Sequence, residues 1–237
     1  MKKDNKTLRF DYKFVFKDKT DKNFTIKLDS KTLDLIHLNK RNKFPSWTKL
    51  PAFKCPCCTL DEKKVKYCPT ITSLIELIES FKDLFSYDKV YIYIDTTARQ
   101  YTANTTLQNG LSSLIGIYMV TSGCPIMSKL KPMVRYHLPF ATMKETNYRA
   151  ISMYLIAQYL RHKHGKKPDW NLNGLIKIYA DVKEVNRNFS EKLGSLEIND
   201  SILNALVRLD CFANFVALTL NRELLDELEL TFSSYLS

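Results

Sequence analysis

The chain of 237 residues contains little glycine and little proline, only 6 and 8 residues. This scarcity excludes collagen-like and low-complexity proteins. The longest apolar run, Leu114–Val120, is far shorter than the ~20 residues that a membrane helix needs. No apolar stretch follows the charged N-terminal residues, so we expect no secretory signal. These absences predict a soluble, cytoplasmic protein that does not enter a membrane.

The sequence also lacks the short motifs that mark common enzymes. It contains no glycine-rich phosphate loop, no nucleophile elbow, no HExxH zinc motif and no kinase signature. Its 4 histidines are too scattered to form a metal triad. The sequence therefore leaves open whether the protein is an enzyme.

Hydrophobic periodicity predicts the order of the secondary-structure elements. Alternating apolar residues predict a β-hairpin with strands at 10–16 and 24–28. A helix beginning at Pro69 and a central strand at 90–94, apolar on both faces, should follow. Further helices are predicted at 106–121, where the residues are apolar nearly all round, and at 143–164, 172–193, 198–220 and 222–235.

These elements predict an α+β fold. A basic part at 1–97 would contain the small hairpin, the strand and a knuckle of cysteines. It would pack on a mainly helical bundle at 98–237, and the two parts would form one compact unit.

Basic charge is concentrated in the N-terminal third of the chain. Residues 1–67 contain 18 Lys or Arg against 8 Asp or Glu, whereas residues 68–237 contain 18 against 17. This asymmetry is typical of a surface for nucleic acid or an acidic protein, and the aromatic residues of 10–16 could stack on bases. The alternatives are a solvated lysine-rich surface and an aromatic core face, which scattered lysines and period-two alternation favour.

Four of the 6 cysteines lie within one short lysine-rich segment. Two of them have the CxxC spacing of a metal knuckle, and a third follows ten residues later. Cys57 adjoins a knuckle cysteine and should point elsewhere, so the fourth ligand would be Cys124 or His137. Soft thiolates favour Zn²⁺, with an iron–sulfur cluster, redox thiols or no metal as alternatives. The predicted metal ligands are Cys55, Cys58, Cys68 and Cys124.

Polar residues between 96 and 149 lie in apolar surroundings and predict a pocket for a small anionic ligand. The residues predicted to line this pocket are Arg99, His137, Glu145 and Arg149. Glu145 and Arg149 are spaced to pair on one helix face, and His137 precedes the N-terminus of that helix, where anions bind. An alternative is an enzyme that uses His137 and Glu145 as acid and base. Another is a network of helix caps and ion pairs without any ligand.

Two polar residues occupy apolar stripes of the later helices. Asn186 and Asp210 both stand where an apolar residue belongs. A buried carboxylate is costly unless it is paired, so we expect Arg99 or Arg149 to pair with Asp210. Asp169, after Pro168, is predicted to cap the next helix.

The chain resembles a family of uncharacterised bacterial proteins that is described as a domain of unknown function. The runs that carry the resemblance are Pro45–Thr48, Thr106–Gly116, Ser122–Pro125, Lys131–Met133, His137–Phe140, Glu145, Tyr148–Arg149, Asp169–Trp170 and Asn204–Ala205. The resemblance implies a bacterial, single-unit protein with the pattern of Cys55, Cys58 and Cys68, and it implies no activity. The chain departs from the family at Thr59, where proline is expected, and at Cys57, which is an extra thiol.

Overall fold

A four-stranded antiparallel sheet forms one side of the molecule. The computed structural model describes residues 7–37, 43–196, 198–219 and 228–237. The strands are β1 (Thr7–Phe16), β2 (Asp21–Asp29), β3 (Lys89–Thr96) and β4 (Gln100–Thr106), in the order β2-β1-β3-β4. The α+β fold class predicted from the sequence is therefore confirmed. The predicted boundary at residue 97 falls in the turn between β3 and β4.

One face of the sheet is buried and the other is open to solvent. Phe10, Tyr12 and Phe14 of β1 lie on the buried face, opposite Ile94 and Ile92 of β3. The prediction that 90–94 is buried on both faces was wrong, because Tyr91 and Tyr93 are 53% and 39% exposed. The helices pack on one face only, so β3 follows the usual alternation of an antiparallel sheet.

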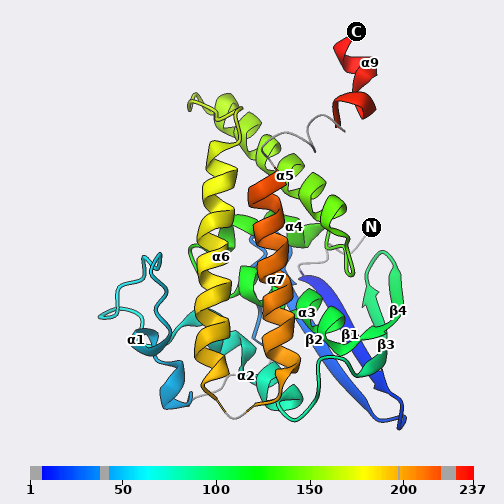
Figure 1. Ribbon diagram of the computed structural model, residues 1–237. Helices are drawn as coiled ribbons and strands as arrows, with labels where there is room; N and C mark the ends of the chain where they lie inside the picture. The colour runs from blue at the N-terminus through cyan, green and yellow to red at the C-terminus, as the bar shows by residue number, and fades with distance from the viewer. Residues whose placement is uncertain (1–6, 38–42, 197, 220–227) are drawn as a thin grey trace, which may run out of the picture.

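The helices form a layer over the buried face of the sheet (Figure 1). The long helices are α2 (Pro69–Phe81), α3 (Leu107–Thr121), α5 (Met143–Lys163), α6 (Asn173–Gly194) and α7 (Asp200–Thr219). The short helical segments are η1 (Ser46–Thr48), α1 (Leu50–Phe53), η2 (Met127–Leu130), α4 (Pro132–Arg135) and α9 (Ser233–Leu236). The short helix predicted at 222–235 lies partly outside the described residues. In Figure 1, α6 and α7 lie side by side and α5 crosses them obliquely.

One side of the apolar helix α7 is buried in the core. By length and composition alone, Asp200–Leu218 could cross a membrane, a test that the core helix of a soluble protein also passes. This helix packs against both α6 and α3, and Ile202, Leu206 and Val216 are completely buried. Burial accounts for these residues only, because a third of Asp200–Leu218 is buried and Val207 and Leu218 are exposed.

Gly110 allows α3 to approach the sheet closely. A Cβ at this position would collide with the side chain of Ile92 and would lie 2.7 Å from Cε1 of Phe14. Both neighbours are fully buried in the sheet, so neither has space to move away. Gly116, two turns later on the same helix, faces a looser contact, because its Cβ would lie 3.7 Å from Cδ2 of Leu209.

We predict that Gly110→Ala lowers the free energy of unfolding by about 1–3 kcal/mol, because an overpacked core side chain forces its neighbours apart. Gly116→Ala is the matched control on the same helix, where the gain in helix propensity should leave stability unchanged or raised by up to ~1 kcal/mol. Urea denaturation of both variants measures the difference. Equal stability of Gly110→Ala and the wild type would contradict the close approach.

Candidate functional site

A mostly apolar cavity of about 180 Å³ lies among the helices. Its walls come from α3, η2, α4, α5, α6, α7 and the loop that leads into α5. The apolar part of the wall includes Ile117, Val120, Met127, Leu130, Val134, Leu209 and Phe212. The polar side chains that line it include Ser113, His137, Arg149, Tyr179, Asn186 and Arg208.

His137 joins the sheet to the helical layer at the edge of this cavity. Its Nε2 lies 2.7 Å from the hydroxyl of Tyr12 on β1 and 3.2 Å from Oγ of Ser113 on α3. The hydroxyls of Tyr12 and Ser113 are 3.0 Å apart, so the three groups form a closed triangle. The hydroxyl of Tyr101 on β4 donates to the carbonyl oxygen of His137 at 3.4 Å. Sequence reasoning identified His137 as a site residue. It missed Tyr12, because the alternation of apolar residues at 10–16 marked Tyr12 only as a core residue.

The His137 ring is held in its neutral form. Burial, with a smaller contribution from the nearby Arg149, lowers the pKa of His137 to about 3. Burial also raises the pKa of Tyr12, which keeps its proton. We therefore assign the Tyr12 hydroxyl as the donor and Nε2 as the acceptor. A general base must take up a proton near neutral pH, so this environment does not suit the acid–base role considered for His137.

Arg149 and Glu145 do not form the ion pair that their spacing predicted, so that prediction was wrong. Glu145 closes a capping box instead, accepting hydrogen bonds from the backbone N–H and hydroxyl of Thr142 at 2.8 and 2.9 Å. Arg149 donates from Nη2 to the carbonyl oxygens of Met133 and Tyr136, both at 2.9 Å. Arg149 lines both the cavity and a neighbouring hollow, whereas Glu145 lines the neighbouring hollow alone.

Arg99 does not line the cavity. It is exposed in the turn between β3 and β4, where its carbonyl oxygen accepts hydrogen bonds from Thr96. Of the four residues predicted to share a pocket, the structure thus brings together His137 and Arg149. Glu145 and Arg99 do not line that cavity.

Asn186 lines the cavity from α6 with an amide oxygen that has no partner. Its side chain is 2% exposed, and Oδ1 has no hydrogen bond within the described part of the chain. The sequence marked Asn186 as a polar residue in an apolar stripe without predicting what it does. Arg208 on α7 is a wall residue that sequence reasoning missed, and its guanidinium lies over the Phe212 ring at 5.3 Å.

Asp210 lies on α7 without either of its expected partners. Its carboxylate accepts a hydrogen bond from Asn214 at 3.1 Å, and burial raises its pKa. The nearby cations that oppose this rise are Lys183 and Arg187 of α6, so the expected pairing with Arg99 or Arg149 was wrong. The N-cap residue of α6 is Leu172 and not Asp169, although the Asp169 carboxylate accepts the backbone N–H of Gly174 in the first turn of the helix at 2.6 Å.

Five of the six cysteines gather where α2 begins and α3 ends. All six are free thiols. Burial raises the pKa of Cys55, and charge on Cys68, Cys57, Cys124 and Cys58 would raise it further. In the residues that the structure describes, no group of three or more His, Cys, Asp or Glu side chains is arranged to hold a metal ion. The predicted fourth ligand, Cys124, nevertheless lies near the predicted knuckle.

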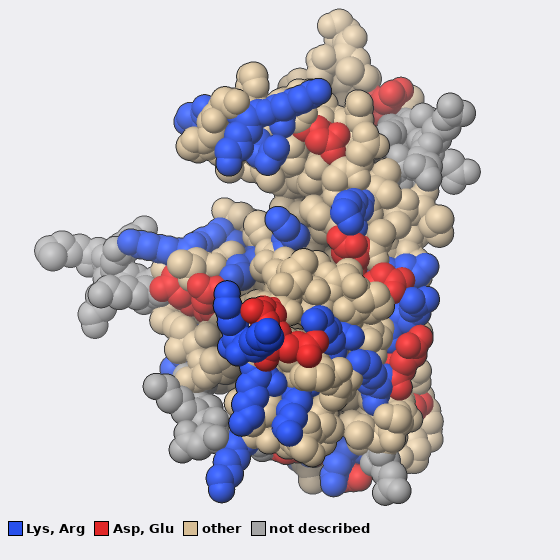
Figure 2. Space-filling view, turned by 90° about the vertical axis from the view of Figure 1, so that its left-hand side faces the viewer, with Lys and Arg blue, Asp and Glu red and all other residues tan. Residues whose placement is uncertain are grey.

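The basic residues do not form an uninterrupted surface. Figure 2 shows the face formed partly by α6 and the segment before α2, where Asp and Glu lie among the Lys and Arg side chains. Ion pairs join Lys54 to Glu62 and Arg187 to Glu184, both at 2.7 Å. The aromatic side chains of β1 that could have stacked on bases, Phe10 to Phe14, lie in the core instead.

We predict that the free energy of unfolding decreases as the pH is lowered below 6.5, because His137 takes up a proton in the unfolded chain and not in the folded one. Between pH 6.5 and about 3, the unfolded chain binds a proton at His137 that the folded chain excludes. The stability that the neutral ring contributes is therefore complete above pH 6.5 and is lost as pH falls, by at most about 1.4 kcal/mol per pH unit. Urea denaturation between pH 5 and 6.5, where carboxyl groups contribute little, should show a smaller slope for His137→Gln than for the wild type. His164→Gln, at an exposed site, is the control and should keep the wild-type slope. The same slope in His137→Gln and the wild type would show that His137 titrates normally.

The comparisons with known proteins place the chain in a family and go no further. No curated protein and no solved structure matches it. A family model, described as a domain of unknown function (DUF6901), matches residues 10–233. The fold and the cavity described above therefore lie within the matched region. Because the match covers nearly the whole sequence, the chain belongs to the DUF6901 family of domains of unknown function.

Proposed function

We propose that the protein binds a small molecule with an apolar body and one anionic group, such as a carboxylate, in the cavity beside His137. One observation carries the proposal. Within the described residues, the cavity wall holds two arginines, Arg149 and Arg208, and no Asp or Glu side chain. His137 is neutral, and Glu145, whose charge acts on Arg149, lies outside this wall and accepts hydrogen bonds from Thr142, so the wall itself contains no counter-charge within the described residues. An anion would supply that counter-charge.

The size and polarity of the cavity restrict the ligand. Its volume of about 180 Å³ is comparable with the ~150 Å³ of an engineered apolar cavity that binds benzene. Most of the wall is apolar, as in small-molecule sites in which a few polar groups fix the orientation. A ring or short branched chain that carries one carboxylate fits this description. A highly charged nucleotide does not.

The donors of Arg149 are arranged to receive an anion. Both of its hydrogen bonds to carbonyl oxygens come from Nη2. Among the described residues, Nε and Nη1 make no hydrogen bond or ion pair, and Arg149 lines the cavity. Burial lowers the pKa of Arg149, although the guanidinium remains charged. A partly buried guanidinium with free donors favours a charge-assisted hydrogen bond to a carboxylate.

Calorimetric titration with benzoate and with its neutral counterpart benzamide tests the proposal. We expect benzoate to bind and benzamide to bind at least ten-fold more weakly, because a hydrogen bond to a charged group contributes about 1.5–3 kcal/mol. Arg149→Gln and Arg208→Gln should each weaken benzoate binding by roughly 10- to 100-fold. Arg161→Gln, near the far end of α5, is the matched control and should bind as the wild type does.

Arg208→Gln keeps the test decisive if Arg149→Gln unfolds, because Arg208, unlike Arg149, donates no hydrogen bond to a backbone carbonyl within the described residues. Equal binding of benzoate and benzamide, or an unchanged affinity in Arg208→Gln, would contradict an anion site. Failure of benzoate and of a series of branched short-chain carboxylates to bind would also reject it.

Asn186 separates a binding role from a structural one. A buried amide oxygen without a partner costs about 1–3 kcal/mol, so Asn186→Leu should leave stability unchanged or raise it by about 1 kcal/mol. The same change should weaken carboxylate binding, because it removes the amide N–H donors that Asn186 could offer to a carboxylate from α6. Thermal unfolding and calorimetry measure the two effects. Lower stability with unchanged binding would show that the amide serves the fold alone.

A further inference from the structure

Helix α5 presents apolar side chains to solvent along its second half. Ile156, Tyr159 and Leu160 are 62%, 60% and 48% exposed, and their spacing places them side by side on one face of the helix. The buried face of the same helix contains two polar residues, Asn147 and Gln158. The usual distribution of apolar residues inward and polar residues outward is therefore partly reversed. Neighbouring apolar side chains left in solvent in this way indicate an interaction surface.

The apolar face of α5 leads directly into a cluster of positive charge. Residues 146–168 contain no Asp or Glu. Four basic residues, all exposed, lie at the end of the helix and in the turn that follows it: Arg161, Lys163, Lys166 and Lys167. Figure 2 shows Lys and Arg side chains gathered at the upper end of the molecule, where α5 meets α6. Exposed apolar and basic side chains thus lie next to each other at this end of α5.

Hydrogen bonds hold the turn that carries these charges. Gly165, with φ of +69°, ends the helix, and its N–H donates to the carbonyl oxygen of His162 at 2.9 Å. Nη2 of Arg161 donates to the carbonyl oxygen of Lys167 at 3.2 Å. The exposed Trp170 borders the same surface hollow as Arg161 and Lys167. The turn therefore presents an aromatic ring beside its basic residues.

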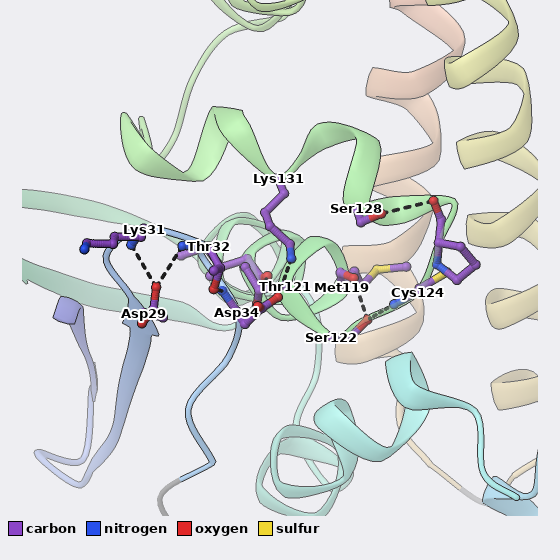
Figure 3. Close-up of polar contacts among 12 residues, drawn as sticks. Asp29, Lys31, Thr32, Asp34, Met119, Thr121, Ser122, Cys124, Ser128 and Lys131 are labelled. Carbon is purple, nitrogen blue, oxygen red and sulfur yellow. Dashed lines mark hydrogen bonds and ion pairs between the residues drawn. The ribbon is translucent and has the colours of Figure 1, made fainter. Parts of the chain in front are cut away.

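Neighbouring acidic residues do not neutralise the charge of this turn. Elsewhere on the surface, basic residues have acidic partners, as Lys131 has in Asp34 at 2.5 Å (Figure 3). Among the residues that the structure describes, no ion pair involves a Lys or Arg of 161–167. Asp169, the first acid after the turn, accepts the backbone N–H of Gly174. An excess of positive charge therefore remains at this end of the molecule.

We propose that this end of α5 binds the surface of an anionic lipid bilayer without crossing it. Ile156 and Leu160 enter the boundary between the headgroups and the acyl chains, and the basic residues of 161–167 contact acidic headgroups. Tyrosine and tryptophan concentrate at that boundary in membrane proteins, which suits Tyr159 and Trp170. The long stems of the lysines cover apolar surface while their charged ends stay in water.

The combination of apolar and basic side chains favours a bilayer over two other partners. Nucleic acid would attract the basic residues through its phosphates, but it would give Ile156 and Leu160 no apolar surroundings. A second copy of the chain could cover Ile156 and Leu160, but a symmetric contact centred here would bring like charges together. An anionic bilayer supplies both an apolar layer and negative charge.

Co-sedimentation of the full-length protein with lipid vesicles tests the proposal. We expect binding to vesicles of phosphatidylcholine with about 30% phosphatidylserine, and at least ten-fold weaker binding to phosphatidylcholine alone. The affinity should fall as the salt concentration rises from ~0.05 to ~0.5 M, because salt screens the attraction. Equal binding to both kinds of vesicle, or no binding to either, would overturn the proposal.

Substitutions of exposed lysines measure the electrostatic part. The double variant Lys166→Gln with Lys167→Gln should bind the anionic vesicles roughly 10- to 30-fold more weakly, since each basic residue near the bilayer contributes about a factor of five. The double variant Lys63→Gln with Lys64→Gln, which removes the same charge from exposed positions before α2, is the matched control. The control should bind as the wild type does, and equal losses in both variants would show that only the net charge matters.

Substitutions of exposed apolar residues measure the other part. Ile156→Ser with Leu160→Ser should weaken vesicle binding at least ten-fold, whereas Val207→Ser with Leu218→Ser, at exposed positions of α7, should leave it unchanged. Unchanged binding in the α5 pair would contradict insertion of this face. An oligonucleotide bound through the lysines, or self-association that the α5 pair abolishes, would reject the bilayer as the partner if vesicles do not bind.

Discussion

Burial of α3 on all sides is the constraint on which the rest of the structure depends. The helix lies between the sheet, α2 and α7, and Leu111, Leu114 and Ile115 are at most 1% exposed. Gly110 removes the side chain where the helix meets the sheet. Ser113 then meets His137 at one edge of the cavity, and the end of the helix leads to Cys124. The cavity and the thiol cluster therefore both take their positions from this one helix.

Periodicity was sufficient to predict the long elements, because each buries a face that its own residues define. The helix predicted at 106–121 begins one residue later, and that predicted at 143–164 ends one residue earlier. β4 was missed because it is an edge strand, whose alternation of Tyr101 and Ala103 with polar residues is weak. β4 is held by its hydrogen bonds to β3, and the residues at 100–106 contain no pattern that predicts this pairing. Tyr91 and Tyr93 were misplaced for the same reason, since only the tertiary arrangement shows which face of β3 lacks a covering layer.

The candidate site was predictable where a polar residue contradicted its apolar surroundings. His137, Arg149 and Asn186 all stood out in this way, and all three line the cavity. Partner choice was not predictable, because spacing shows which residues share a helix face and not which of several acceptors or donors is closest. Glu145 could pair with Arg149, one turn later in the helix, or with Thr142, three residues earlier. The geometry of the helix N-terminus favoured hydrogen bonds to Thr142. Arg208 could not be predicted in this way, because an arginine in a helix beside a phenylalanine is common and does not stand out from its surroundings.

The interior charges distinguish a binding site from a structural network of caps and ion pairs. A network places a carboxylate near each buried cation, because an uncompensated charge in an apolar region is costly. Glu145 caps the helix and acts on Arg149 through its charge without an ion-pair contact among the described residues, and the hydrogen bonds of Arg149 go to the carbonyl oxygens of Met133 and Tyr136. Those dipoles orient the guanidinium without neutralising it. Asn186 adds an amide oxygen that the described residues leave unpartnered. A guanidinium without a paired carboxylate in the described part of the chain, at an apolar cavity, supports the proposed anionic ligand, whereas the unpartnered oxygen of Asn186 would need a hydrogen-bond donor, which a carboxylate does not supply.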